Sequence, residues 1–345
     1  MLAESAPLCE VYDVALLDLD GVVYLGSDPI AGAAPALAHA RRRGMRLAFV
    51  TNNASRRPAE VARLLAGMGI PAAEADVVTS AQAAVARLGE RVPAGSRVLV
   101  VGASAFAEEV RAAGFQPVTD ADSRPAAVVQ GMGPATTWQD LAEATVAVRA
   151  GAVWIAANAD NTLPSARGDL PGNGALVAVV AATTGKTPEV VGKPQPALHE
   201  LSVQRTGARR PLVVGDRLDT DIEGAVAGGA DSLLVLTGVT TPDMLLAAPA
   251  GRRPTYLAAD LAGLIQPQPA VRVDGDWRAC GGFRVRAAPG RLVLDGGPGA
   301  PVDALRALCA AGWAWLAGPV EVLAQGEEAL AALKHLGLPV ASTAS

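Results

Sequence analysis

Cysteine is scarce in this sequence, and long hydrophobic runs are missing. The 345 residues include three cysteines, Cys9, Cys280 and Cys309, and no two of them form a Cys-x-x-Cys pair. Such isolated cysteines are typical of reduced, structural thiols, and they argue against a disulfide framework or a zinc site. Apolar stretches such as Leu308–Ala317 are far shorter than the roughly 20 residues that a membrane-spanning helix needs. The sequence therefore predicts a protein that neither spans a membrane nor depends on disulfides.

Clustered positive charge is also missing. The chain has 29 Lys and Arg residues against 34 Asp and Glu residues, a net charge of −5, and its basic clusters, such as Arg41–Arg43, are short. Nucleic-acid binding requires a continuous basic surface, so no nucleic-acid partner is expected. Residues 1–10 lack the basic start and apolar segment of a secretory signal, and we expect a cytoplasmic protein.

The first two-thirds of the chain alternates between strand and helix patterns. Val14–Asp20 is a continuous apolar run that ends in acids, which is typical of a strand buried on both faces of a parallel sheet. Further strands are expected at Leu47–Thr51, Val98–Val101, Ala126–Gln130, Val153–Ala157, Pro211–Gly215 and Ser232–Leu236. Helical patterns lie between them at Ala59–Met68, Ser80–Gly89, Trp138–Ala150 and Pro196–Arg205. This alternation predicts a doubly wound α/β fold with a parallel sheet.

The pattern changes after the proline-containing segment Pro267–Pro269. Two stretches of alternating apolar and polar residues surround Ala288-Pro289-Gly290 and predict an antiparallel hairpin. A helix, a strand and a second helix should follow at Val302–Trp315, Val320–Ala324 and Glu327–Leu336. We therefore expect a small C-terminal α+β module of the form ββαβα.

Acidic residues gather at the ends of two predicted strands. Asp18 and Asp20 lie two residues apart where the first strand ends, and Asp216, Asp219 and Asp221 follow Val213-Val214-Gly215. Two carboxylates that lie close together at the end of a buried strand are energetically unfavourable unless a cation neutralises their charge. Open α/β sheets place their ligands at the carboxyl ends of strands, so these acids predict a site for a hard, oxygen-liganded cation such as Mg²⁺.

Two further segments supply donors for an anion. Thr51-Asn52-Asn53 follows the strand Leu47–Thr51, and Lys193 lies in Gly192-Lys193-Pro194 ahead of a helix. Each segment alone is more often a turn or a helix cap. Together with the acids, they provide what phosphoryl transfer needs: a nucleophile, a metal site and donors for the phosphoryl oxygens.

The combination of Asp18-Leu-Asp-Gly-Val, Thr51, Lys193 and Gly215-Asp-Arg-Leu-Asp-Thr-Asp resembles the four motifs of haloacid-dehalogenase-superfamily phosphatases. The long segment between the second and third motifs is similar to the one in the p-nitrophenyl phosphatase subclass of this superfamily, which carries a large α/β cap at this place. This resemblance implies a core formed by residues 1–80 and 188–266, a cap at 81–187 and a C-terminal extension at 270–345.

The resemblance also implies residue roles. Asp18 would be the nucleophile that forms an aspartyl-phosphate, and Asp20 the general acid and base. Thr51 and Lys193 would hold the phosphoryl oxygens. Mg²⁺ would be bound at Asp18, Asp20 (through its main-chain carbonyl) and Asp216, with Asp221 orienting a metal-bound water. The implied substrate-binding residues are Gly21, Thr51, Asn52, Asn53 and Lys193 from the core and Asn158 and Asp160 from the cap loop Asn158–Pro164.

The resemblance narrows the substrate to a small phosphorylated metabolite. A similar extension, resembling part of an acetyltransferase fold, occurs in actinobacterial glycerol 3-phosphate phosphatases, so glycerol 3-phosphate is the favoured substrate. Phosphoglycolate, a nucleotide and pyridoxal phosphate are alternatives. A phosphate-binding regulatory pseudoenzyme is an alternative of another class. No membrane partner is expected, and the sequence leaves self-association into a homo-oligomer open. The extension lacks a loop for a CoA pyrophosphate, and we expect a structural or interfacial role for it.

Overall fold

A computed structural model describes residues 6–163, 167–315 and 321–339. The chain divides into two compact units, one formed by residues 1–46 and 210–345 and the other by residues 47–209. None of the helices in the described part of the chain is long and apolar enough to cross a membrane.

A parallel sheet forms the centre of the first unit. Its strands run in the order β15-β14-β13-β1, and every neighbouring pair is parallel. Their bounds are Val14–Leu17 (β1), Pro211–Gly215 (β13), Asp231–Val235 (β14) and Tyr256–Ala258 (β15). The strands predicted at Val14–Asp20, Pro211–Gly215 and Ser232–Leu236 are thereby confirmed. The first is shorter than predicted, because β1 ends at Leu17 and leaves both acids beyond the strand.

Helices and short turns connect these strands. A two-stranded hairpin, β2 (Tyr24–Leu25) with β3 (Asp28–Pro29), follows the first acid pair. The helical elements of this part of the unit are α1 (Leu8–Val11), which precedes β1, α2 (Ala33–Arg42), the π-helical turn η2 (Leu218–Ile222), α9 (Glu223–Ala227), α10 (Pro242–Leu246), η3 (Ala250–Arg252) and η4 (Leu261–Leu264), which follows β15.

The C-terminal module is a five-stranded sheet in the order β16-β17-β18-β19-β20. Its elements are β16 (Arg272–Asp274), β17 (Trp277–Cys280), β18 (Phe283–Ala288), β19 (Arg291–Gly296), α11 (Pro301–Trp315), β20 (Glu321–Gln325) and α12 (Glu327–His335). The hairpin and the α11-β20-α12 succession are confirmed, although Val320 lies outside the described residues. The predicted form ββαβα is wrong, because β16 and β17 precede the hairpin and extend its antiparallel sheet.

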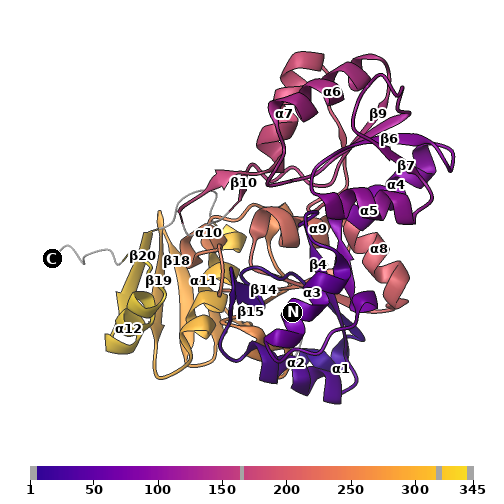
Figure 1. The fold of residues 1–345 in the computed structure, drawn as a ribbon. Helices are drawn as coiled ribbons and strands as arrows, with labels where there is room; N and C mark the ends of the chain where they lie inside the picture. The colour runs from indigo at the N-terminus through magenta and orange to yellow at the C-terminus, as the bar shows by residue number, and fades with distance from the viewer. Residues whose placement is uncertain (1–5, 164–166, 316–320, 340–345) are drawn as a thin grey trace. The chain divides into compact units, whose positions relative to one another are not determined.

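The module and the parallel sheet of the first unit share one hydrophobic core. Leu234 and Leu257 of β14 and β15 belong to the same buried cluster as Phe283, Leu305 and Leu308 of the module. Helices α11 and α12 both contribute to this cluster and lie alongside strands β18–β20 (Figure 1). The C-terminal module is therefore an integral part of the first unit.

The second unit contains a parallel strand pair and a five-stranded sheet. Most of β4 (Arg46–Thr51) lies in this unit, and β4 pairs in parallel with β5 (Val77–Thr79). The five-stranded sheet has the order β12-β9-β8-β6-β7, with bounds Arg97–Val101 (β6), Gln116–Val118 (β7), Ala127–Gln130 (β8), Val153–Ala156 (β9) and Glu189–Val190 (β12). These bounds confirm the strands predicted at Leu47–Thr51, Val98–Val101, Ala126–Gln130 and Val153–Ala157.

The helices of the second unit surround these strands. Helices α6 and α7 lie side by side (Figure 1) and share one apolar cluster with β6, β8 and β9. The helices are α3 (Pro58–Gly67), α4 (Ser80–Arg91), α5 (Ser104–Ala112), α6 (Trp138–Arg149), α7 (Asn173–Thr184) and α8 (Ala197–Thr206), with η1 (Glu74–Asp76) before β5 and a small hairpin, β10 (Thr162–Leu163) with β11 (Leu170–Pro171). The four helices predicted in this region are confirmed within two residues at each end. The predicted boundaries of core, cap and extension stay a prediction.

The three cysteines are free and buried. Burial raises the pKa of Cys280 to about 12, aided by the negative charge of Asp303. Burial likewise raises the pKa of Cys9 and of Cys309. A protonated thiol is a poor nucleophile, so these side chains act as packing residues, as the sequence indicates.

Candidate active site

Three carboxylates converge at the carboxyl end of the parallel sheet in the first unit. Asp18 directly follows β1, Asp216 directly follows β13, and these two strands are parallel neighbours. Asp221 comes from the turn η2. One ligand oxygen from each of the three lies within 4.8 Å of the others, with Asp216 and Asp221 buried and Asp18 partly buried. Adjacent strand ends thus bring together acids that are about 200 positions apart in the chain.

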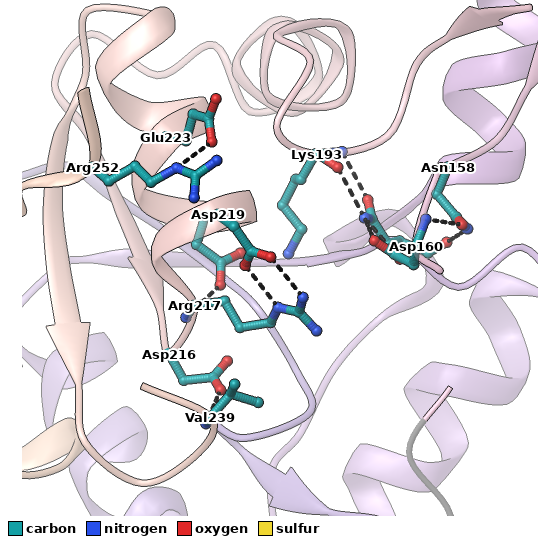
Figure 2. A network of polar contacts seen from close by, with 11 residues as sticks. Asn158, Asp160, Lys193, Asp216, Arg217, Asp219, Glu223, Val239 and Arg252 are labelled. Carbon is teal, nitrogen blue, oxygen red and sulfur yellow. Dashed lines mark hydrogen bonds and ion pairs between the residues drawn. The ribbon is translucent and has the colours of Figure 1, made fainter. Parts of the chain in front are cut away.

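Main-chain donors fix the two buried acids. The Val239 N–H donates to Asp216 Oδ2 at 2.7 Å, a contact visible in Figure 2. The Thr240 N–H donates to the Asp216 carbonyl at 3.2 Å. The Arg217 N–H donates to Asp221 Oδ2, also at 3.2 Å. Both carboxylates are therefore held in a fixed orientation by the backbone.

Glycines make room for these acids. A Cβ atom at Gly238 would lie 2.0 Å from Asp216 Oδ2, and one at Gly21 would lie 2.5 Å from the same atom. A Cβ atom at Gly215 would lie 2.2 Å from the Cβ of Asp221. These glycines let three segments of main chain pass close to the carboxylates of Asp216 and Asp221. Mg²⁺ is usually held by one or two carboxylates together with water and phosphate oxygens, and the three acids can supply these carboxylates. The residues present fit a magnesium ion.

The close approach at Gly238 gives a test of this site. We expect Gly238→Ala to lower Mg²⁺ affinity by at least tenfold, because the new methyl group must displace the Asp216 carboxylate. Gly251→Ala is the matched control, since a Cβ there meets nothing within 4 Å. Isothermal titration with Mg²⁺ measures both variants. Equal affinity in the two would show that Asp216 does not hold the metal.

The other residues predicted in this unit lie around the carboxylate cluster. Asp20 is exposed, and its Oδ1 accepts a weak hydrogen bond of 3.5 Å from the Gly26 N–H of the β2–β3 hairpin. Gly21 adopts φ +83°, and its carbonyl accepts a 2.6 Å hydrogen bond from the Thr237 hydroxyl. Asp219, which the sequence groups with the other acids, is exposed and forms an ion pair of 3.0 Å with Arg217 (Figure 2).

In the second unit, Thr51 and Lys193 are both buried. Thr51 ends β4, and its hydroxyl oxygen accepts a 3.1 Å hydrogen bond from the Asn53 N–H. The Lys193 ammonium donates to the Val50 carbonyl at 3.2 Å. Two of the residues predicted to hold an anion thus lie with their polar groups around the end of one strand.

The amide side chains near Lys193 bind other parts of the protein. Asn52 hydrogen-bonds the main chain of Lys193 and the carboxylate of Asp160. Asn158 donates to the Asn52 carbonyl at 2.7 Å. Asn53 accepts from the Ser55 N–H and hydroxyl, both at 2.7 Å. The structure therefore places these predicted substrate-binding side chains in contacts within the chain, and Pro164 of the predicted cap loop lies outside the described residues.

Comparison with known proteins shows which family has these motifs. Residues 15–116 match the model of a haloacid dehalogenase-like hydrolase family, and residues 190–264 match a second model of related hydrolases. The D-glycerol 3-phosphate phosphatase of Mycobacterium tuberculosis is 45% identical over 349 residues, which cover 96% of each chain. The chain belongs to the haloacid dehalogenase-like hydrolases. Its resemblance to this family, drawn from the four motifs, is confirmed.

Solved structures of other haloacid dehalogenase-like hydrolases show the same fold. A crystal structure of the M. tuberculosis glycerol phosphate phosphatase in complex with magnesium is 44% identical, with a TM-score of 0.89 over 97% of this chain and 100% of that chain. The 4-nitrophenylphosphatase of Thermotoga maritima is 30% identical, with a TM-score of 0.70 over 75% of this chain and 99% of that chain. Residues 280–338 match a GCN5-related N-acetyltransferase-like domain, which supports the predicted likeness of the extension.

Sequence reasoning missed the loop of this hydrolase that holds Asp216. Thr237, Gly238 and Val239 follow β14 and contact Gly21 or Asp216. A signal for them was available, because Gly238 lies three residues beyond β14, and a glycine in the loop after a parallel strand often permits close backbone approach. The segment was overlooked because it carries no ionisable side chain.

Proposed function

We propose that this protein is a Mg²⁺-dependent phosphatase that hydrolyses glycerol 3-phosphate to glycerol and inorganic phosphate. The observation that carries the proposal is the extent of the match to the M. tuberculosis enzyme, which covers 96% of both chains and so includes the C-terminal module. An acid sugar phosphatase of Staphylococcus saprophyticus, by contrast, is 37% identical and matches 74% of this chain. Of these two relatives, the one that matches almost the whole chain is named for glycerol 3-phosphate.

In the proposed reaction, Asp18 acts as the nucleophile. A carboxylate oxygen of Asp18 attacks phosphorus, the bond between phosphorus and the ester oxygen breaks, and Asp20 gives a proton to the leaving alkoxide. Asp20 then takes a proton from a water molecule, which attacks the aspartyl-phosphate and releases inorganic phosphate. The exposure of Asp20 supports this role, because the group must reach both the leaving group and water.

The remaining residues stabilise charge. The Lys193 ammonium and the Thr51 hydroxyl are proposed to hold phosphoryl oxygens, since cationic and neutral donors stabilise the charge that spreads over them. Asp18, Asp216 and the main-chain carbonyl of Asp20 would hold Mg²⁺, with Asp221 orienting one of its waters. The ion would neutralise charge on the phosphoryl group. We also propose that the reaction takes place in the cytoplasm, which the three free, buried cysteines support.

A panel of phosphate esters tests the proposal. With Mg²⁺ present, we expect glycerol 3-phosphate to give the highest kcat/KM among glycerol 3-phosphate, phosphoglycolate, a nucleoside monophosphate, pyridoxal phosphate and p-nitrophenyl phosphate, measured as phosphate release. Excess EDTA should abolish release from every ester, and added Mg²⁺ should restore it, because the metal stabilises a charge common to all of them.

Other outcomes distinguish the alternatives. A higher kcat/KM for another ester would support phosphatase activity but identify that ester, and not glycerol 3-phosphate, as the preferred substrate. Binding of inorganic phosphate without release from any ester would identify a phosphate-binding regulatory protein. Full activity in EDTA would contradict the proposed metal site.

A further inference from the structure

Asn52 forms an unusual bridge within the second unit. Its Oδ1 accepts a 2.8 Å hydrogen bond from the Lys193 N–H, and its Nδ2 donates to the Lys193 carbonyl at 3.1 Å. The same Nδ2 group donates to both carboxylate oxygens of Asp160, at 3.1 and 3.3 Å. One amide therefore links two residues that are 108 and 141 positions away in the chain.

The main chain just before Lys193 passes very close to the Asn52 amide. A Cβ atom at Gly192 would lie 2.7 Å from Asn52 Oδ1 and 2.5 Å from the Ala157 carbonyl oxygen. Only glycine allows the main chain to approach the amide and the β9 end so closely. The glycine before the lysine is thus required by two close approaches, one to the Ala157 carbonyl and one to the Asn52 amide.

The loop that carries Asp160 is anchored on the same residue. The Asn158 Nδ2 group donates to the Asn52 carbonyl at 2.7 Å, and Asn158 Oδ1 accepts from the Asp160 N–H at 3.2 Å. Asn173 Nδ2, at the start of α7, donates to the Asn158 carbonyl at 2.7 Å. Figure 2 shows Asn158, Asp160 and Lys193 grouped around these contacts. The position of Asp160 is therefore determined by polar contacts from several segments.

We propose that Asn52 and Asp160 are positioning residues that orient Lys193, and that Asp160 acts on the reaction through Asn52 rather than by contact with the substrate. This inference rests on the proposed function, in which Lys193 holds a phosphoryl oxygen. The Asp160 carboxylate fixes the amide, and the amide fixes both main-chain polar groups of Lys193. A misplacement of about 1 Å can reduce the rate of a reaction about 10²-fold.

Exchanging the two side chains tests this arrangement. Asn52→Asp keeps the acceptor for the Lys193 N–H but sets a carboxylate against both Asp160 and the Lys193 carbonyl, and we expect kcat to fall about 100-fold with little change in KM. Asp160→Asn keeps an acceptor for the amide and should lose less than about fivefold. The double variant Asn52→Asp/Asp160→Asn again pairs a donor with an acceptor between the two side chains but does not restore the donor for the Lys193 carbonyl, so it should recover part of the loss, at least about threefold in kcat over Asn52→Asp.

A comparison of two substrates distinguishes a positioning role of Asp160 from direct contact between Asp160 and the substrate. Asp160→Ala should lower kcat for glycerol 3-phosphate and for p-nitrophenyl phosphate by the same factor, because Lys193 serves the phosphoryl group of both. Gln139→Ala in α6, whose amide bonds Glu143 on the surface, is the control and should match the native enzyme. A loss confined to glycerol 3-phosphate, or no recovery in the double variant, would overturn the proposal.

Amide hydrogen exchange gives a readout that does not depend on turnover. In ¹⁵N-labelled protein, the Lys193 N–H should exchange at least tenfold faster in Asn52→Ala than in Gln139→Ala. If the native protein hydrolyses no ester but this difference appears, the proposed function fails and the bridge stands. If the protein is an active phosphatase but the difference is absent, the bridge fails alone.

Discussion

Asp18→Asn should abolish turnover while the protein remains folded. The substitution leaves the shape of the side chain almost unchanged but removes the nucleophilic oxygen anion, and we expect kcat to fall by about 10⁴-fold or more, as happens when other covalent hydrolases lose their nucleophile. Steady-state phosphate release from p-nitrophenyl phosphate measures this loss over a wide range.

Stability measurements separate lost chemistry from lost structure. Asp18, Asp216 and Asp221 place carboxylate oxygens within 4.8 Å of one another, and like charges at that distance repel when no cation is bound. The Tm of Asp18→Asn in EDTA should therefore equal or exceed that of the native protein. Asp219→Asn is the control, because this acid pairs with Arg217 at the surface, and its kcat should stay within about twofold. Native kcat in Asp18→Asn would remove Asp18 from the mechanism.

Elements with buried side chains could be predicted from the sequence, and exposed ones could not. Strands β1, β13 and β14 read as continuous apolar runs because the sheet buries both of their faces. In contrast, β16 is exposed along its whole length, so Arg272–Asp274 carries no hydrophobic signal. Its place in the sheet depends on pairing with β17, which sequence periodicity does not encode.

The same contrast applies to the candidate site. Asp18 and Asp216 could be grouped from the sequence, because each directly follows an apolar strand and parallel strands end at a common edge. The bridge at Asn52 could not, since its partners Asp160 and Lys193 are distant in the chain and asparagine after a strand is common in turns. Local pattern thus places the acids of the site, whereas the orientation of Lys193 depends on tertiary contacts.

Deletion of residues 270–345 should prevent the first unit from folding. The deleted module contributes Phe283, Leu305 and Leu308 to the core that it shares with Leu234 and Leu257. Each fully buried side chain of this size contributes about 1.5–3 kcal/mol, and a domain has only about 5–15 kcal/mol of net stability. Residues 1–269 alone should therefore lack a cooperative thermal transition and aggregate, as measured by calorimetry and light scattering.

A point substitution keeps this prediction testable when the shortened chain cannot be purified. Leu308→Ala in α11 should lower the free energy of unfolding by about 2–5 kcal/mol, because it leaves a cavity in the shared core. Met244→Ala in α10, a side chain that is 46% exposed, should cost less than about 1 kcal/mol. Since the shared core includes residues of β14 and β15, Leu308→Ala should also lower the temperature at which phosphatase activity is lost. If Leu308→Ala unfolds the module while activity persists to the native temperature, the module is an independent attachment and not part of the enzyme's fold.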